Sequence, residues 1–251
     1  MREQYGNAVA RHYAAFRPDL HAPILSRTIE EGERFSIGID LGCGAGHSTV
    51  ALAKYCDQVF GVDRSPMMLA HAAKHAKVAY LLGDGENLRE IPDLPVDLVA
   101  FAGSLPYLKT DGLRTQLPRI CRSGATIVVY DFEIDVDLVL DDADLSVPAA
   151  EKGYDHAANL HCWREFCVTA TGQEPLQLAL SSEELGHVVL ADLGKLNALS
   201  TRFRTNDPYR EVVKRLSRVN GNHQLQATSY NARYEFLPRH GRQTSDAFVD
   251  K

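Results

Sequence analysis

Residues 39–48 read IDLGCGAGHS, and this stretch decides the fold class. Its first residues end a short apolar run that is typical of a buried strand, and its last residues open a helical pattern. Gly42, Gly44 and Gly46 allow the backbone to turn sharply and to approach a ligand closely. A glycine loop between a strand and a helix is where open α/β sheets bind nucleotides, because the helix N-terminus offers free N–H groups there.

Around this loop, short apolar runs alternate with helical patterns up to residue 132. Ser65-Pro66 is a helix start, with serine as N-cap and proline at the first helical position. Strands that alternate with helices form βαβ units, so we expect a Rossmann-like, doubly wound α/β fold with a mostly parallel sheet. The expected strands are 37–41, 58–63, 78–82, 96–102 and 125–132, and the expected helices are 47–55 and 67–77.

The chain outside this core is less regular. Residues 133–148 carry many acidic side chains and are interpreted as an irregular, solvated excursion. Residues 181–184 form a capping box, and the apolar residues from Leu185 to Leu199 fall on one helical face. Alternating residues at 230–236 predict an antiparallel strand. The expected organisation is an N-terminal helical lid (1–35), a cofactor-binding core (36–132), an insertion or cap (133–180), and C-terminal helices with an antiparallel strand that completes the sheet (181–251).

Acidic residues end three consecutive strands of the expected core. Asp40 directly precedes the glycines, Asp63 follows Gly42 by 21 residues, and Asp84 follows Asp63 by another 21. A carboxylate in the position of Asp63 suits the two hydroxyls of a ribose, because it accepts two hydrogen bonds. Asp84 can accept from the exocyclic amine of an adenine, with the backbone of Gly85 close to the ring. The three acids therefore indicate one ligand crevice.

The glycine loop does not fit the phosphate-binding fingerprints. The last position of G-x-G-x-x-G/A is His47 when it is counted from Gly42 and Thr49 when it is counted from Gly44, and no Gly-Lys-Ser/Thr follows. A carboxylate at Asp40 would repel a pyrophosphate but suit a cationic ligand. S-adenosylmethionine carries an ammonium and a sulfonium, so it fits this loop better than a dinucleotide.

Four segments in register resemble the class I S-adenosylmethionine-dependent methyltransferases: residues 39–46, 61–65, 83–88 and 96–99. The whole chain is also similar to their trans-aconitate methyltransferase-like branch, through Tyr13 to Pro18, residues 180–185 and Asp207-Pro208. That branch carries an N-terminal arginine near the cofactor carboxylate, which implicates Arg17. Where relatives often have His-Trp after the fourth strand, this chain has Pro106-Tyr107. Together, the residues and the resemblance predict cofactor contacts from Arg17, Asp40, Gly42, Gly44, Gly46, Asp63, Arg64, Met68, Asp84, Gly85 and Glu86.

The predicted reaction is methyl transfer to a small molecule, with S-adenosylhomocysteine as the product. We expect an oxygen acceptor; a carboxylate needs no base, whereas a hydroxyl can need one. Tyr107 is the catalytic candidate, as a positioning group, and His12 and Glu133 are alternatives as bases. Two other functions stay open: a non-catalytic S-adenosylmethionine-binding regulator, and a methyltransferase that acts on RNA or protein.

Composition narrows the range of partners. The formal net charge of -6 gives no electrostatic footprint for nucleic acid. No apolar run approaches the roughly 18 residues of a membrane span. Five cysteines without a CxxC pair favour reduced thiols and a cytoplasmic protein, and the spacing of His156, His161, Cys162 and Cys167 does not match a zinc site. We therefore expect no nucleic acid, membrane or metal partner, and a monomer or homodimer.

Overall fold

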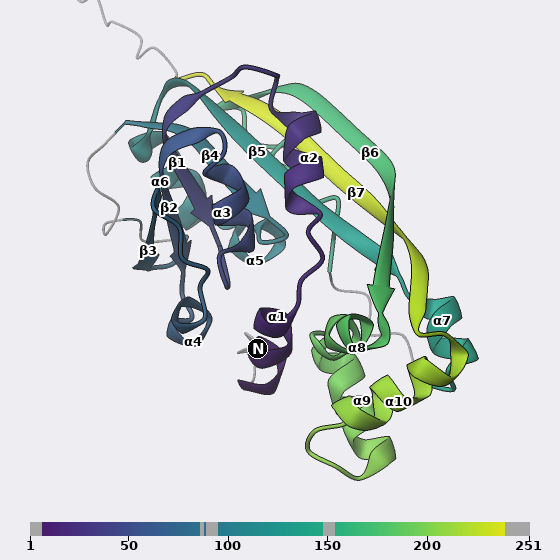
Figure 1. Ribbon diagram of the computed structural model, residues 1–251. Helices are drawn as coiled ribbons and strands as arrows, with labels where there is room; N and C mark the ends of the chain where they lie inside the picture. Colours follow the sequence, from purple (N-terminus) through teal and green to yellow (C-terminus); the bar gives the residue numbers. More distant parts are fainter. Residues whose placement is uncertain (1–6, 86–87, 89–94, 148–153, 239–251) are drawn as a thin grey trace, which may run out of the picture.

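One seven-stranded sheet organises the protein in the computed structural model, which describes residues 7–85, 88, 95–147 and 154–238 (Figure 1). Its strand order is β3-β2-β1-β4-β5-β7-β6. The first five strands along the chain are parallel, and β7 pairs antiparallel with both β5 and β6. The strands are β1 (Phe35–Leu41), β2 (Cys56–Asp63), β3 (Val78–Leu82), β4 (Val96–Ala102), β5 (Cys121–Asp135), β6 (Phe166–Ser181) and β7 (Asn222–Phe236).

Helices cover both faces of the parallel part, as expected for a doubly wound fold. On one face, Ile24 of α2 and Leu52 of α3 pack in one apolar cluster with Leu98 and Tyr130 of the sheet. On the other face, Leu113 of α6 packs in a second cluster with sheet residues. The strands between the helices are almost wholly apolar because both of their faces are buried. The helices of this half are α2 (His21–Thr28), α3 (His47–Leu52), α4 (Pro66–Ala70), α5 (Leu105–Leu108) and α6 (Asp111–Ile120).

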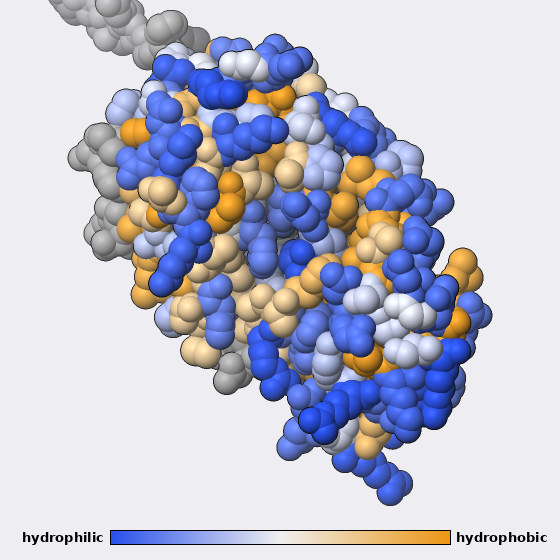
Figure 2. Space-filling model, in the orientation of Figure 1, coloured by the Kyte–Doolittle hydropathy of each residue, from blue (hydrophilic) through white to orange (hydrophobic). Residues whose placement is uncertain are grey.

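The long strands β5, β6 and β7 extend beyond the parallel strands and carry a helical group at their far end (Figure 1). This group has its own apolar cluster, to which Leu140, Leu185, Leu199 and Leu216 contribute. On the face shown in Figure 2, hydrophilic residues dominate its surface. We call α7 (Asp137–Asp142), α8 (Ser182–Leu190), α9 (Leu193–Phe203) and α10 (Tyr209–Val219) the helical group.

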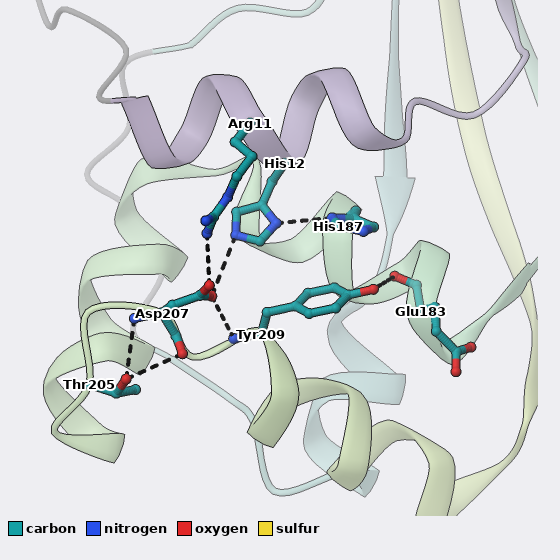
Figure 3. A network of polar contacts seen from close by, with 7 residues as sticks. All are labelled: Arg11, His12, Glu183, His187, Thr205, Asp207 and Tyr209. Carbon is teal, nitrogen blue, oxygen red and sulfur yellow. Dashed lines mark hydrogen bonds and ion pairs between the residues drawn. The ribbon is translucent and has the colours of Figure 1, made fainter.

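Helix α1 (Asn7–Ala15) is attached to the helical group by a polar network (Figure 3). Arg11 donates to Asp207 at 2.8 Å, and the Nδ1 atoms of His12 and His187 lie 3.0 Å apart in a hydrogen bond. The ring of Tyr209 stacks on His187 with 4.3 Å between centroids. The two helices of the N-terminal segment therefore pack on different parts of the molecule: α1 on the helical group and α2 on the sheet.

Several local expectations are confirmed. Ser65 caps α4 with Pro66 at the helix start, and Ser181 and Glu184 form the capping box of α8. The expected strand at 230–236 is antiparallel and belongs to the longer β7. The mostly parallel Rossmann-like sheet is likewise present.

Other local expectations are wrong. The helix expected at 67–77 ends at Ala70, because the following chain turns back to the glycine loop, where Ala73 N donates to Ala45 O at 3.0 Å. The stretch 133–148 is not an irregular excursion, because it contains the last residues of β5 and helix α7. The helix pattern at 185–199 is two helices that break at Asp192, the N-cap of α9. The part expected as a cap, 133–180, also contains nearly all of the edge strand β6.

Candidate functional site

The glycine loop turns at the carboxyl end of β1, next to the point where the strand order reverses between β1 and β4. Gly42, Gly44 and Gly46 have φ angles of 75°, 53° and 80°, which is the left-handed region that favours glycine. A Cβ on Gly42 would lie 2.5 Å from Cβ of Ser104, and one on Gly46 would lie 2.0 Å from the hydroxyl of Tyr80. The loop therefore requires glycine for both backbone conformation and space.

Asp63 ends β2 beside this loop, and the chain's own backbone holds its carboxylate. One oxygen accepts from Gly44 N at 2.8 Å and the other accepts from Ser65 N at 2.8 Å. Each carboxylate oxygen has further acceptor capacity. The side chain is thus fixed before any ligand binds, with both oxygens able to accept one more hydrogen bond.

A cavity of ≈ 520 Å³ lies at this edge of the sheet. Tyr13 of α1 faces Gly44 across it, since a Cβ on Gly44 would be 3.7 Å from the Tyr13 ring. Most of the expected cofactor residues line the wall: Gly42, Gly44, Asp63, Arg64, Met68, Asp84 and Gly85, together with Tyr107, the catalytic candidate. Glu86 lies outside the described residues. The structure therefore brings three of the four resembling segments to one cavity.

Asp40 does not line the cavity, contrary to the expectation that its charge would face the ligand. Its side chain is fully buried beneath the loop, where Oδ2 accepts from Ser48 at 2.6 Å and Thr49 at 2.7 Å. Burial raises the pKa of this carboxyl to about 6, against the lowering effect of the two hydroxyls. Asp40 supports the fold of the loop and start of α3, so its charge no longer distinguishes S-adenosylmethionine from a dinucleotide.

Gly46 and Arg17 are also absent from the cavity wall. Gly46 is the N-cap of α3, behind the loop. The Arg17 guanidinium lies over the rings of Tyr13, at 4.9 Å, and Phe132, at 4.3 Å. Its Nε is buried and has no hydrogen-bond partner among the described residues. Arg17 is thus a partly buried cation beside a residue of the cavity wall.

Sequence reasoning did not identify a polar cluster that lies next to the cavity. Asp131 of β5 accepts hydrogen bonds from Tyr154 and His156, and Tyr154 also donates to the carbonyl of Gly103 in the cavity wall. Asp131 is 23 residues from Tyr154 and 25 from His156, and no motif spacing links it to them. An acid near the carboxyl end of a core strand was the one available signal, and the expected strand at 125–132 contained it.

The fold is Rossmann-like, with a cavity at its glycine loop, and comparisons show which proteins its core resembles. The methyltransferase domain family matches residues 39–124, from β1 through the glycine loop to β5. A probable S-adenosylmethionine-dependent methyltransferase of Saccharomyces cerevisiae is 29% identical over 133 residues, which are 49% of this chain and 45% of that protein. A trans-aconitate 2-methyltransferase of Methylobacterium radiotolerans is 36% identical over 102 residues, which are 39% of this chain and 37% of that protein.

Solved structures agree on the fold. A protein of Anaeromyxobacter dehalogenans named a "putative type II methyltransferase" has a TM-score of 0.59 and 20% identity, and the match covers 95% of this chain and 100% of that one. A phosphoethanolamine N-methyltransferase of Haemonchus contortus has a TM-score of 0.51 and 18% identity, over 95% of this chain and 59% of that one. The match over residues 39–124 and these relatives therefore support a class I S-adenosylmethionine-dependent methyltransferase domain in this part of the chain. Its matches span less than half the length of the two curated relatives described above.

The described residues also bear on the expected partners. None of the helices in residues 7–85, 88, 95–147 and 154–238 is both long and apolar enough to cross a membrane. Within the same ranges, no three His, Cys, Asp or Glu side chains gather as a metal site would require. All five cysteines are free thiols, of which Cys162 and Cys167 are exposed.

Proposed function

We propose that this protein transfers the methyl group of S-adenosylmethionine to an oxygen of a small-molecule acceptor. The observation that carries the proposal is the carboxylate of Asp63, which two backbone N–H groups hold at the cavity wall. A carboxylate that is already fixed and still able to accept suits the adjacent hydroxyls of a ribose. The family match over the same loop favours S-adenosylmethionine as the molecule that carries this ribose.

Other residues of the site fit the remaining parts of this cofactor. Asp84, Gly85 and Met68 line the cavity beyond Asp63, where an adenine would lie between an acceptor group and apolar surface. A buried donor without a partner is costly, and Arg17 Nε is such a donor, so an anionic group such as the carboxylate of the cofactor's methionine moiety would stabilise it. S-adenosylmethionine supplies a methyl group that its sulfonium already activates, so the chain mainly has to align the acceptor and exclude water.

The acceptor class is inferred from the shape and charge of the site. A cavity of ≈ 520 Å³ has the size of ordinary small-molecule sites, and the chain carries a net charge of -6. Both features argue for a small acceptor and against RNA. The similarity to a trans-aconitate 2-methyltransferase over 102 residues also favours methylation at oxygen. Tyr107, which lines the cavity and is 54% exposed, is proposed to position the acceptor.

Calorimetric titration tests the cofactor assignment. We expect micromolar S-adenosylmethionine binding and no comparable binding of NAD to the wild-type protein. Asp63→Ala removes both acceptor oxygens and should weaken S-adenosylmethionine binding by roughly 10-fold to 100-fold or more, because even one hydrogen bond to a charged group contributes about 1.5 to 3 kcal/mol. Asp57→Ala is the matched control, since Asp57 is an exposed acid at the opposite end of β2.

Two results would overturn this assignment: binding of NAD in preference, or equal S-adenosylmethionine affinity in the Asp63→Ala and Asp57→Ala variants. Formation of S-adenosylhomocysteine with a panel of small acids, alcohols and phenols then tests the reaction. Binding without turnover over the whole panel would favour a regulatory S-adenosylmethionine-binding protein. Turnover only with RNA or protein would favour a macromolecular methyltransferase.

A further inference from the structure

A buried carboxylate that the cofactor site does not use lies at the cavity edge of β5. Asp131 is 6% exposed, and its carboxylate accepts hydrogen bonds from three groups. Oδ1 accepts from Phe132 N at 2.7 Å, and Oδ2 accepts from the Tyr154 hydroxyl and from His156 Nδ1, both at 2.8 Å. A buried ionised carboxyl is stable only with such partners. Asp131 therefore acts as an acceptor that fixes the two rings.

Asp131 holds the imidazole of His156 through one ring nitrogen, Nδ1. Because Nδ1 faces the carboxylate, the neutral ring carries its proton on Nδ1 and leaves the lone pair on Nε2. No described residue hydrogen-bonds to Nε2, and the side chain is 30% exposed. A buried carboxylate that orients a partly accessible imidazole is the arrangement of a general base and its positioning group.

The surroundings of His156 set its proton affinity. Burial lowers the pKa of His156, but the hydrogen bond and the negative charge of Asp131 outweigh it, so the net shift is upward. Glu133 on the same strand adds to the upward shift, and Arg17 from the α1–α2 connection opposes it. The ring also stacks on Tyr230 of β7 at 6.1 Å and meets Tyr154 edge-on at 4.7 Å.

The cluster shares a wall with the cofactor cavity. Gly103 lines the cavity, its carbonyl accepts from the Tyr154 hydroxyl at 2.6 Å, and a Cβ on it would lie 2.9 Å from Asp131 Oδ1. Tyr107 also lines the cavity, and its ring lies 5.4 Å from that of Tyr154. His156 is not itself among the residues that line the cavity; its ring lies 4.7 Å from that of Tyr154, beside the wall to which Gly103 and Tyr107 contribute. These aromatic walls suit a planar acceptor ring.

We propose that His156 is the general base of the reaction, that Asp131 positions it, and that the acceptor is the hydroxyl of a planar aromatic molecule, a phenol. This inference rests on the function proposed above and names its acceptor class. As the phenol oxygen bonds to the methyl carbon, the carbon–sulfur bond breaks and its electron pair stays on sulfur. The phenol proton moves to Nε2 of His156, and the imidazolium passes it to water. The products are an aryl methyl ether, S-adenosylhomocysteine and a proton.

Phenols and matching benzoates distinguish a base from a merely structural histidine. A benzoate is already ionised and needs no base, whereas a phenol with a pKa near 10 does. His156→Gln should lower kcat for phenols by roughly 100-fold or more, and the loss should shrink for nitrophenols, which ionise more easily. Affinity for S-adenosylmethionine, measured by calorimetry, should stay at the wild-type value. His161→Gln, an exposed histidine five residues on, is the matched control and should behave as wild type.

The role of Asp131 is tested by a measurement that a purely structural residue would not change, the pH dependence of kcat. Asp131→Asn removes the charge, so the acidic limb of the kcat profile should move to lower pH, together with the His156 titration seen by NMR. Should Asp131→Asn fail to fold, Tyr154→Phe tests the same cluster, because it removes one of the two side-chain hydrogen bonds to Asp131.

The outcomes separate this inference from the function on which it rests. Absence of S-adenosylmethionine binding would refute the proposed function itself. With binding intact, three results would overturn the inference: wild-type turnover of benzoates alone, no turnover of any phenol, or equal phenol rates in His156→Gln and His161→Gln. Phenol methylation that His156→Gln selectively abolishes would establish it.

Discussion

Acidification should loosen α1, because this helix buries a neutral histidine. The side chain of His12 is 2% exposed and contacts His187 and Tyr209 (Figure 3). Burial, with help from His187 and Arg11 and against Asp207, lowers the pKa of His12 to about 4. When α1 detaches, the ring returns to its ordinary value of about 6.5. Between these values the detached helix binds more protons, so the attached state is fully stable above pH 6.5 and loses stability as the pH falls toward 4.

The size of the effect follows from the two pKa values. Between pH 7 and pH 5, attachment of α1 should lose about 2 kcal/mol, which is a roughly 20-fold increase in opening. Hydrogen–deuterium exchange of the α1 amides, corrected for intrinsic rates, measures this opening directly. His12→Gln keeps a polar side chain but cannot titrate, so its opening should change little over the same range. His161→Gln is the exposed control.

The reasoning would be refuted if wild type and His12→Gln showed the same change in α1 exchange between pH 7 and pH 5. Uniformly faster exchange across the sheet would also contradict it, because that would report global unfolding and not detachment of α1. A change that is present in wild type and His161→Gln but absent from His12→Gln would assign the effect to this one ring.

Three further substitutions test the loop and its neighbours. Gly46→Ala should lower the free energy of unfolding by roughly 2 kcal/mol or more in urea titrations, because φ is +80° and the new Cβ meets the Tyr80 hydroxyl, whereas Gly221→Ala, in open space, should not. The pKa of Asp40 is raised to about 6, so the folded state is stabilised by the protonated carboxyl at low pH, and this stabilisation is lost as the pH rises through 6. Between pH 5 and pH 7, the free energy of unfolding of wild type should therefore fall by about 1 kcal/mol more than that of Asp40→Asn. Equal losses would contradict the burial argument. Arg17→Met should weaken S-adenosylhomocysteine binding in calorimetry by about 10-fold or more through loss of a charge-assisted contact, and an unchanged affinity would assign Arg17 to packing alone.

The parallel half of the fold could be predicted because its buried strands are visible in the sequence as apolar runs. The run from Val96 to Ala102 is apolar on both faces, and Asp97, its one acid, accepts from the backbone of β1. Strand β6 has no such apolar run. It is an edge strand with mostly exposed residues and contains Gly172 and Pro175, and it forms by pairing with β7 along its length. Its existence depends on a template that is distant in the sequence.

The candidate site divides in the same way. The cofactor side could be predicted because Gly42, Gly44 and Asp63 all lie near strand ends, and the order of the strands places such ends together. The strand ends do not reveal which way a side chain faces, so the sequence could not show that Asp40 is buried beneath the loop. Asp131 and His156 meet only because the loop that follows α7 returns to β5, and no local pattern encodes that return.

The ladder between β5 and β7 has a mechanical consequence. It is paired without a register shift from Thr126 to Asp135, and it runs from the Rossmann-like core to the helical group (Figure 1). A hinge between these two parts would have to break this ladder, so we expect the core and the helical group to move together. Tyr13 is the residue of α1 that lines the cavity. We therefore expect ligand entry to depend on movement of α1, and this movement to become easier when His12 is protonated.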